Sequence, residues 1–161
     1  MPSKTRPEIE KIARKLLKEN DMYKLPLDSV LANKIGAKVA NPEFIDMSIS
    51  GMITVNSETA QILVNMLDPP HRKIFTIAHE LGHKVLHLES GCNYVDSQIN
   101  MFRRNLDVDC EEQRKEVEAT QFAAALLMGE NFVREIWQTV TSVYRMADLF
   151  SSVTICNGIQ V

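Results

Sequence analysis

Three side chains in the segment FTIAHELGHKVLH stand at a spacing that suits metal-ion chemistry. His79 and His83 are four residues apart, and Glu80 directly follows the first of them. On a helix, residues four apart lie one turn above each other, so both imidazoles can bind one Zn²⁺ at about 2.0–2.1 Å. Glu80 is rotated by roughly 100° from His79. That angle favours a general base acting on a water at the metal, which is the H-E-x-x-H pattern.

The helix that carries these residues separates an apolar side from a histidine side. His79, His83 and His87 fall on the histidine side. The alternative interpretation, an ordinary amphipathic helix with solvated histidines, does not require that separation. H-E-x-x-H sites take their third ligand from elsewhere, so we interpret His87 as an outer contact of the site or a surface residue. The apolar side holds Ile74, Ile77, Ala78, Leu81, Val85 and Leu88.

A third metal ligand is expected from a second helix, over residues 110–128. Position 89, where one protease class has a further histidine, is a glutamate. On a helical wheel Glu116 points into the apolar arc, Glu118 lies at its edge, and Glu112 is also on the inner side. A carboxylate aimed into an apolar stripe is costly unless it is paired or bound to a metal. Glu116 is therefore the preferred third ligand, with Glu118 and Glu112 as alternatives.

Helices surround a central group of short strands in the predicted arrangement. Polar and glycine-containing turns separate the three central strand segments, which we interpret as an antiparallel meander. The fold class is therefore α+β: a small antiparallel three-stranded sheet packed on the histidine helix, with further helices at both ends. The small Ala119 and Ala123 would let the second metal-bearing helix approach closely. Helices are predicted over 7–20, 27–35, 70–87, 109–128 and 132–150, strands over 37–40, 44–50, 52–55 and 61–64, and a long loop over 91–107.

Composition restricts the class of protein. With 161 residues, 45% of them hydrophobic and 24% charged, the chain is expected to form a single globular domain over residues 1–161. Its net charge of −3 gives no general attraction for nucleic acid, and we interpret the basic residues near the start as a solvated helix face. The three cysteines lack C-x-x-C spacing, which indicates reduced thiols. Neither a signal peptide nor a membrane-spanning segment is recognisable, so a cytoplasmic protein is expected.

Two linked segments of the sequence carry a family resemblance. The segments RKIFTIAHELGHKVLH and EVEATQFAAALLM resemble the ImmA/IrrE family of metallopeptidases, which has FT-x-AHE-[LI]-GH-x-x-LH followed by E-x-x-A-[ND]-x-FAA-x-LLMP. The upstream SGMITVN is similar to the family's G-x-I-x-VN strand, and the whole resemblance covers roughly residues 7–150. It implies a zinc protease with a glutamate as third ligand. His79, His83 and Glu116 would then bind the metal, and Glu80 would be catalytic.

The resemblance also implies a substrate class, and the sequence departs from the family pattern in places. Family members cleave helix-turn-helix repressors of mobile elements, prophages or stress-response genes. We therefore expect a separate repressor protein as substrate. Thr120 stands where Asn or Asp is usual, and its hydroxyl can replace only part of the hydrogen bonding that such a group gives a metal ligand. Gly129 replaces the usual proline after LLM.

The expected reaction is hydrolysis of a peptide bond, with Glu80 as general base and Zn²⁺ as cofactor. Tyr94 and His87 are candidate donors to the oxyanion. One alternative is a non-catalytic regulator that binds a repressor or antitoxin through the same domain. Another is a purely structural zinc site, which would need four closed protein ligands. The cysteine spacing does not supply them.

Overall fold

Helices and strands alternate through the part of the chain that the structure describes. The computed structural model describes residues 3–20, 29–55, 59–87, 93–97, 110–129, 133–134 and 137–138. No helix in these parts is long and apolar enough to cross a membrane. Apart from two short helical pieces, the helices predicted over 132–150 lie outside the described residues. The elements are α1 (Arg6–Glu19), α2 (Ser29–Lys34), β1 (Ala37–Ala40), β2 (Ile49–Val55), β3 (Ala60–Val64), α3 (Pro70–Leu86), β4 (Asn93–Ser97) and α5 (Cys110–Leu127).

The strands form one mixed sheet in the order β1-β3-β2-β4. β2 runs antiparallel to both of its neighbours, with Ile53 opposite Ile62 of β3, whereas β1 runs parallel to β3. The predicted α+β class is confirmed. The sheet is larger than the predicted meander, because β1 joins it at one edge and β4 at the other.

The strand predicted over residues 44–50 is wrong, because residues 41–48 are irregular and β2 begins at Ile49. The carboxylate of Asp46 accepts hydrogen bonds from the Ser48 amide at 2.9 Å and the Ser48 hydroxyl at 2.7 Å. Such a local turn competes with strand pairing. Ile45 is fully exposed, so its apolar side chain marks no buried face. Within the predicted loop over 91–107, residues 93–97 form β4 and the remainder lies outside the described residues.

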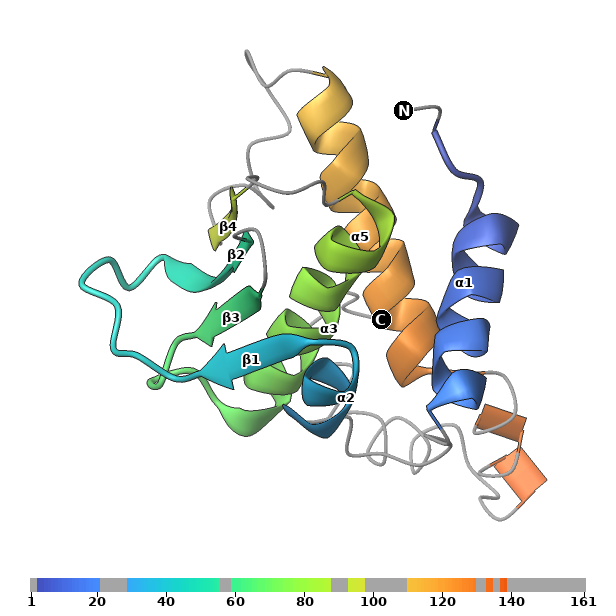
Figure 1. Cartoon of the computed structure of the whole chain (residues 1–161), viewed down its shortest axis with the longest axis horizontal. Helices are drawn as coiled ribbons and strands as arrows, with labels where there is room; N and C mark the ends of the chain where they lie inside the picture. Colours follow the sequence, from blue (N-terminus) through green and yellow to red (C-terminus); the bar gives the residue numbers. More distant parts are fainter. Residues whose placement is uncertain are drawn as a thin grey trace.

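The histidine helix α3 lies between the sheet and α5, and α1 packs on α5 (Figure 1). Helix α3 begins at Pro70, as the sequence predicted, because a proline in the first helical turn lacks an amide hydrogen that has no partner there in any case. Helices α1, α2, α3 and α5 and the sheet bury one continuous apolar core. Its larger members include Ile9, Leu31, Ile53, Ile62, Phe75, Leu81 and Phe122.

Small residues allow α3 and α5 to approach closely, as the sequence predicted. A Cβ atom placed on Gly82 would lie 3.0 Å from both the Cα and the carbonyl oxygen of Ala119. Ala119 and Ala123 are fully buried. Since these neighbours belong to backbone and to a methyl group, they cannot turn aside as a flexible side chain would. The contact therefore fixes the distance between the two helices that carry the candidate ligands.

We expect Gly82→Val to lower the free energy of unfolding by about 1–3 kcal/mol, because the added side chain must push α5 away from α3. Denaturant unfolding measures this difference. Gly129→Val is the matched control, since a Cβ there would meet only the Ala125 carbonyl oxygen, at 4.0 Å. Equal losses of stability in the two variants would contradict the close contact.

Candidate metal centre

The histidine side of α3 faces the interior of the protein. His79 and His83 are each 1% exposed, and Glu80 is fully buried. The opposite side of the helix carries core residues such as Ile77 and Leu81. The interpretation of α3 as an amphipathic helix with solvated histidines is therefore wrong. Two adjacent imidazoles and a carboxylate inside a protein need partners, because polar groups are costly to bury alone.

Glu116 of α5 reaches both imidazoles. Its carboxylate oxygens lie 3.2 Å from the Nε2 atom of His79 and 3.3 Å from the Nε2 atom of His83. The two Nε2 atoms are 3.1 Å apart. Donor atoms about 2.0–2.1 Å from a shared tetrahedral ion lie roughly 3.3 Å from one another. The three separations thus fit a single Zn²⁺-sized ion between the side chains.

Glu118 and Glu112, the alternative third ligands, lie apart from this cluster. Among the described residues, the His, Cys, Asp and Glu side chains that could share an ion are His79, His83 and Glu116. Glu112 is exposed. Glu118 is buried, but its carboxylate binds the N-terminal segment and approaches His87. Glu80 is also outside the cluster, in agreement with the role of a base and not of a ligand.

The carboxyl group of Glu116 is held in its ionised form. Burial by itself would raise its pKa, but the hydrogen bonds from His79 and His83 outweigh that effect and lower the pKa to about 2. The group is therefore a carboxylate at neutral pH. This is the form that a divalent cation binds.

Thr120 takes part in the site despite its departure from the family pattern. Its hydroxyl oxygen lies 3.5 Å from the Nδ1 atom of His79, at the long end of hydrogen bonding. The Nε2 atom of the same ring faces Glu116. A polar contact on the far nitrogen orients a ligating imidazole and fixes its tautomer. Thr120 supplies that contact in place of the usual amide or carboxylate.

Glu80 lies close to the backbone of β2, at a contact that the sequence did not reveal. A Cβ atom on Gly51 would overlap the Cγ2 atom of Thr76 and would lie 3.8 Å from the Oε1 atom of Glu80. Thr76 is one helical turn before Glu80 and is fully buried. Gly51 therefore leaves room for α3 to rest on the sheet. The signal in the sequence is the glycine of SGMITVN, which also occurs in the similar G-x-I-x-VN strand of the family; β2 runs through Gly51, so this glycine does not break a strand.

The side chain of His87 is only 5% exposed, so of its two interpretations the surface residue is wrong and the outer contact of the site agrees with the structure. Its ring centroid lies 5.9 Å from that of His83, and its Nε2 atom lies 3.7 Å from the Oε2 atom of Glu118. Burial, followed by the charge on His83, lowers the pKa of His87 to about 4 in spite of Glu118 and a hydrogen bond to the Lys115 backbone. The ring is thus neutral at neutral pH. The side chain of Tyr94, the other candidate oxyanion donor, lies outside the described part of the structure.

Gly51→Ala should lower the free energy of unfolding by about 1–3 kcal/mol, because the new methyl group overlaps Thr76. Thr76→Ser removes the Cγ2 atom that is struck and keeps the hydroxyl. Alone, Thr76→Ser should cost about 1 kcal/mol for a lost buried methyl group. In the Gly51→Ala background it should instead restore part of the lost stability, since the new Cβ would still lie 3.0 Å from the Leu63 carbonyl oxygen. A double-mutant cycle by denaturant unfolding checks this reversal, and additive losses would show that the two residues do not meet.

Comparison with known proteins gives a finding in agreement with this geometry. The family model described as the IrrE N-terminal-like domain (Peptidase_M78) matches residues 32–151, well over half of the chain. The matched range contains β1 to β4, the histidine helix and α5, and thus all four candidate site residues. A search of curated proteins finds no match. With His79, His83 and Glu116 gathered at one point and the family model spanning them, the chain belongs to the ImmA/IrrE family of metallopeptidases.

Proposed function

We propose that this protein is a zinc-dependent endopeptidase whose metal is held by His79, His83 and Glu116. One observation carries the proposal: the three donor pairs are 3.1–3.3 Å apart, as ligands of one tetrahedral ion are. Three protein ligands leave one coordination position open, as in catalytic and not in structural zinc sites. We also propose that residues 1–161 act as one domain, because Ile9 and Ala13 of α1 share the core with Phe122 of α5.

The chemistry divides between the ion and the chain. When bound, zinc supplies a Lewis acid that polarises the scissile carbonyl and lowers the pKa of water. Glu80 accepts a proton from the attacking water and passes it to the nitrogen of the leaving amine as the peptide bond breaks. Its neighbour Thr76 and the backbone at Gly51 limit where that carboxylate can lie. Thr120 holds the His79 ring so that its Nε2 atom faces the site.

The substrate proposal comes from the family. Because members of the ImmA/IrrE family cleave helix-turn-helix repressors, we propose that such a repressor, of a mobile element, prophage or stress-response system, is the substrate in the cytoplasm. The net charge of −3 supports a protein partner over direct contact with nucleic acid. A non-catalytic regulator that binds the same kind of partner is the competing function. The complete burial of Glu80 favours it, since a substrate must reach past the surrounding side chains.

Glu80→Gln should retain Zn²⁺ and slow repressor cleavage by at least about 10²-fold, because the amide cannot take the proton. The substrate is the helix-turn-helix protein encoded beside this gene, with cleavage followed by gel and mass spectrometry and bound zinc by metal analysis. Glu112→Gln, at an exposed position, is the control and should cleave at the wild-type rate. The competing regulator function would be favoured by two results together. The Glu80→Gln protein would bind the repressor and relieve repression as well as wild type does, and neither protein would cleave the repressor.

Glu116→Gln should weaken Zn²⁺ binding by more than about 100-fold, since the loss of a ligand exceeds the 10–100-fold effect of outer contacts. Glu112→Gln again serves as control, because it removes the same charge from the same helix at an exposed position. Competition with a chelator measures both dissociation constants. Similar zinc affinities for wild type and Glu116→Gln would contradict the assignment of Glu116 as the third ligand.

A further inference from the structure

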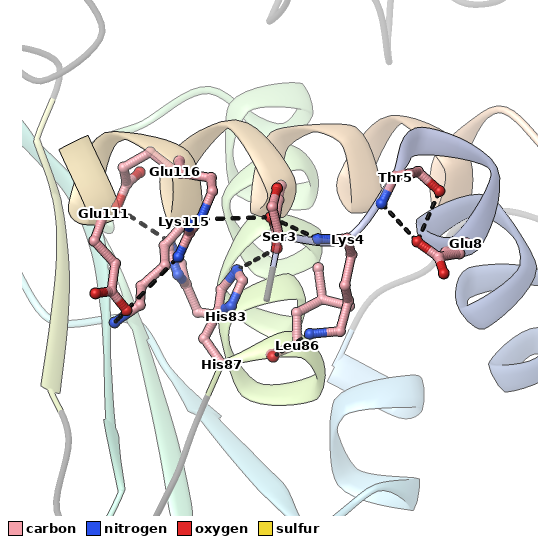
Figure 2. A network of polar contacts seen from close by, with 12 residues as sticks. Ser3, Lys4, Thr5, Glu8, His83, Leu86, His87, Glu111, Lys115 and Glu116 are labelled. Atoms are coloured by element: carbon pink, nitrogen blue, oxygen red, sulfur yellow. Dashed lines mark hydrogen bonds and ion pairs between the residues drawn. The ribbon is translucent and has the colours of Figure 1, made fainter. Parts of the chain in front are cut away.

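The segment before α1 makes two sets of hydrogen bonds, one to the first turn of α1 and one to helices α3 and α5. At its end, the Glu8 carboxylate accepts hydrogen bonds from the Thr5 amide and hydroxyl, each at 2.7 Å, and thereby caps the helix. Ahead of this cap, Ser3 and Lys4 contact the two metal-bearing helices, the middle of α5 and the C-terminal end of α3 (Figure 2). We call Ser3 and Lys4 the N-terminal clip. Its contacts are not those of a solvated basic face, which is how the sequence had us interpret Lys4.

The clip binds α5 two residues beyond Glu116. The Ser3 hydroxyl donates to the Oε1 atom of Glu118 at 3.0 Å, and the Lys4 amide donates to the same oxygen at 3.1 Å. The Glu118 side chain is only 6% exposed. Hydrogen bonds to a buried carboxylate are roughly twice as strong as those between neutral groups. This end of the clip is therefore a specific attachment to α5.

The clip also binds the end of α3. The Lys4 ammonium donates to the carbonyl oxygen of Leu86 at 3.1 Å, at the C-terminus of the histidine helix (Figure 2). The last carbonyls of a helix lack partners within the helix and attract positive charge. Lys4 thus satisfies one of them one turn after His83. A single residue thus joins the middle of α5 to the end of α3, through its backbone amide to Glu118 and through its side chain to Leu86.

His87 forms a second link between the same helices. It caps α3, and its ring approaches Glu118 and hydrogen-bonds the backbone of Lys115. The carbonyl of Lys115 belongs to the peptide bond that precedes Glu116. The contacts of the clip and of His87 therefore flank Glu116 on α5, on the residues immediately before it and two after it. His83 lies one turn before His87 on α3.

We propose that the N-terminal clip is a positioning device that locks α5 to α3 and thereby sets the affinity of the centre for its metal. The inference rests on the proposed metal function. The Gly82–Ala119 contact limits how near the helices come, but contact between smooth small residues does not prevent α5 from turning about its axis. A turn of α5 would carry the Glu116 carboxylate away from the two imidazoles. Attachments at Lys115 and Glu118 oppose that rotation.

The test compares Ser3→Ala/Lys4→Met, in which both side-chain contacts are lost, with Lys11→Met, which removes one charge from the exposed side of α1. The zinc dissociation constant is measured by chelator competition. The unfolding midpoint is measured without metal and at one fixed zinc concentration. We expect about tenfold weaker binding in the double variant, the lower end for outer contacts. Zinc should therefore raise the unfolding midpoint of the double variant by less than it raises that of wild type. Lys11→Met should match wild type in both measurements.

Glu118→Gln provides an independent second variant that keeps the side chain's volume and leaves the N-terminal sequence intact. It should also weaken zinc binding. Unchanged dissociation constants in both variants, with midpoints lowered equally with and without zinc, would show that the clip only stabilises the fold and would overturn the inference. A wild-type protein that fails to bind Zn²⁺ would instead overturn the metal centre itself, and the role of the clip with it.

Discussion

The arrangement of this protein depends on one largely buried contact, the Glu116 carboxylate held between the imidazoles of His79 and His83. Each group is costly to bury by itself, and the three offset that cost only when they meet. They come from two helices separated by a strand and a long stretch of chain. The packing of α3 on α5 must therefore be set within a few tenths of an ångström. This explains why a glycine and an alanine, and not larger residues, lie at the crossing.

The opposite side of α3 is subject to a related constraint. There the sheet must come close enough to enclose Glu80 and yet leave its carboxylate space. Gly51 meets both needs, because β2 can lie directly against Thr76 only where no Cβ intervenes. The histidine helix is thus in close contact on two sides, with Gly51 of β2 and, through its own Gly82, with Ala119 of α5. Its ionisable groups are positioned by backbone contacts, which move less than side chains do.

Local patterns predicted the helices and most of the site. The 3.6-residue period marked α1, α3 and α5, and the H-E-x-x-H spacing marked the histidines and Glu80. Features that depend on distant partners were missed. β4 lies in a polar segment that forms a strand by pairing with β2, and residues 44–50 alternate in polarity but end in a turn held by Asp46. The roles of Ser3 and Lys4 arise from groups more than eighty residues away, for which a single sequence offers no local signal.

Glu116 and Glu118 show where reasoning from one helix ends. They are two residues apart, so their side chains differ by roughly 200° around α5, and both are at least partly buried. On the helical wheel Glu116 points into the apolar arc and Glu118 lies at its edge, which makes either of them a candidate ligand. The two acids differ in the partners that other segments provide. Glu116 contacts the imidazoles of α3, whereas Glu118 accepts hydrogen bonds from the Lys4 amide and the Ser3 hydroxyl and lies near the end of α3. Because each acid is satisfied only in this rotational setting of α5, the structural contact at Glu118 and the candidate metal contact at Glu116 stabilise the same orientation of the helix.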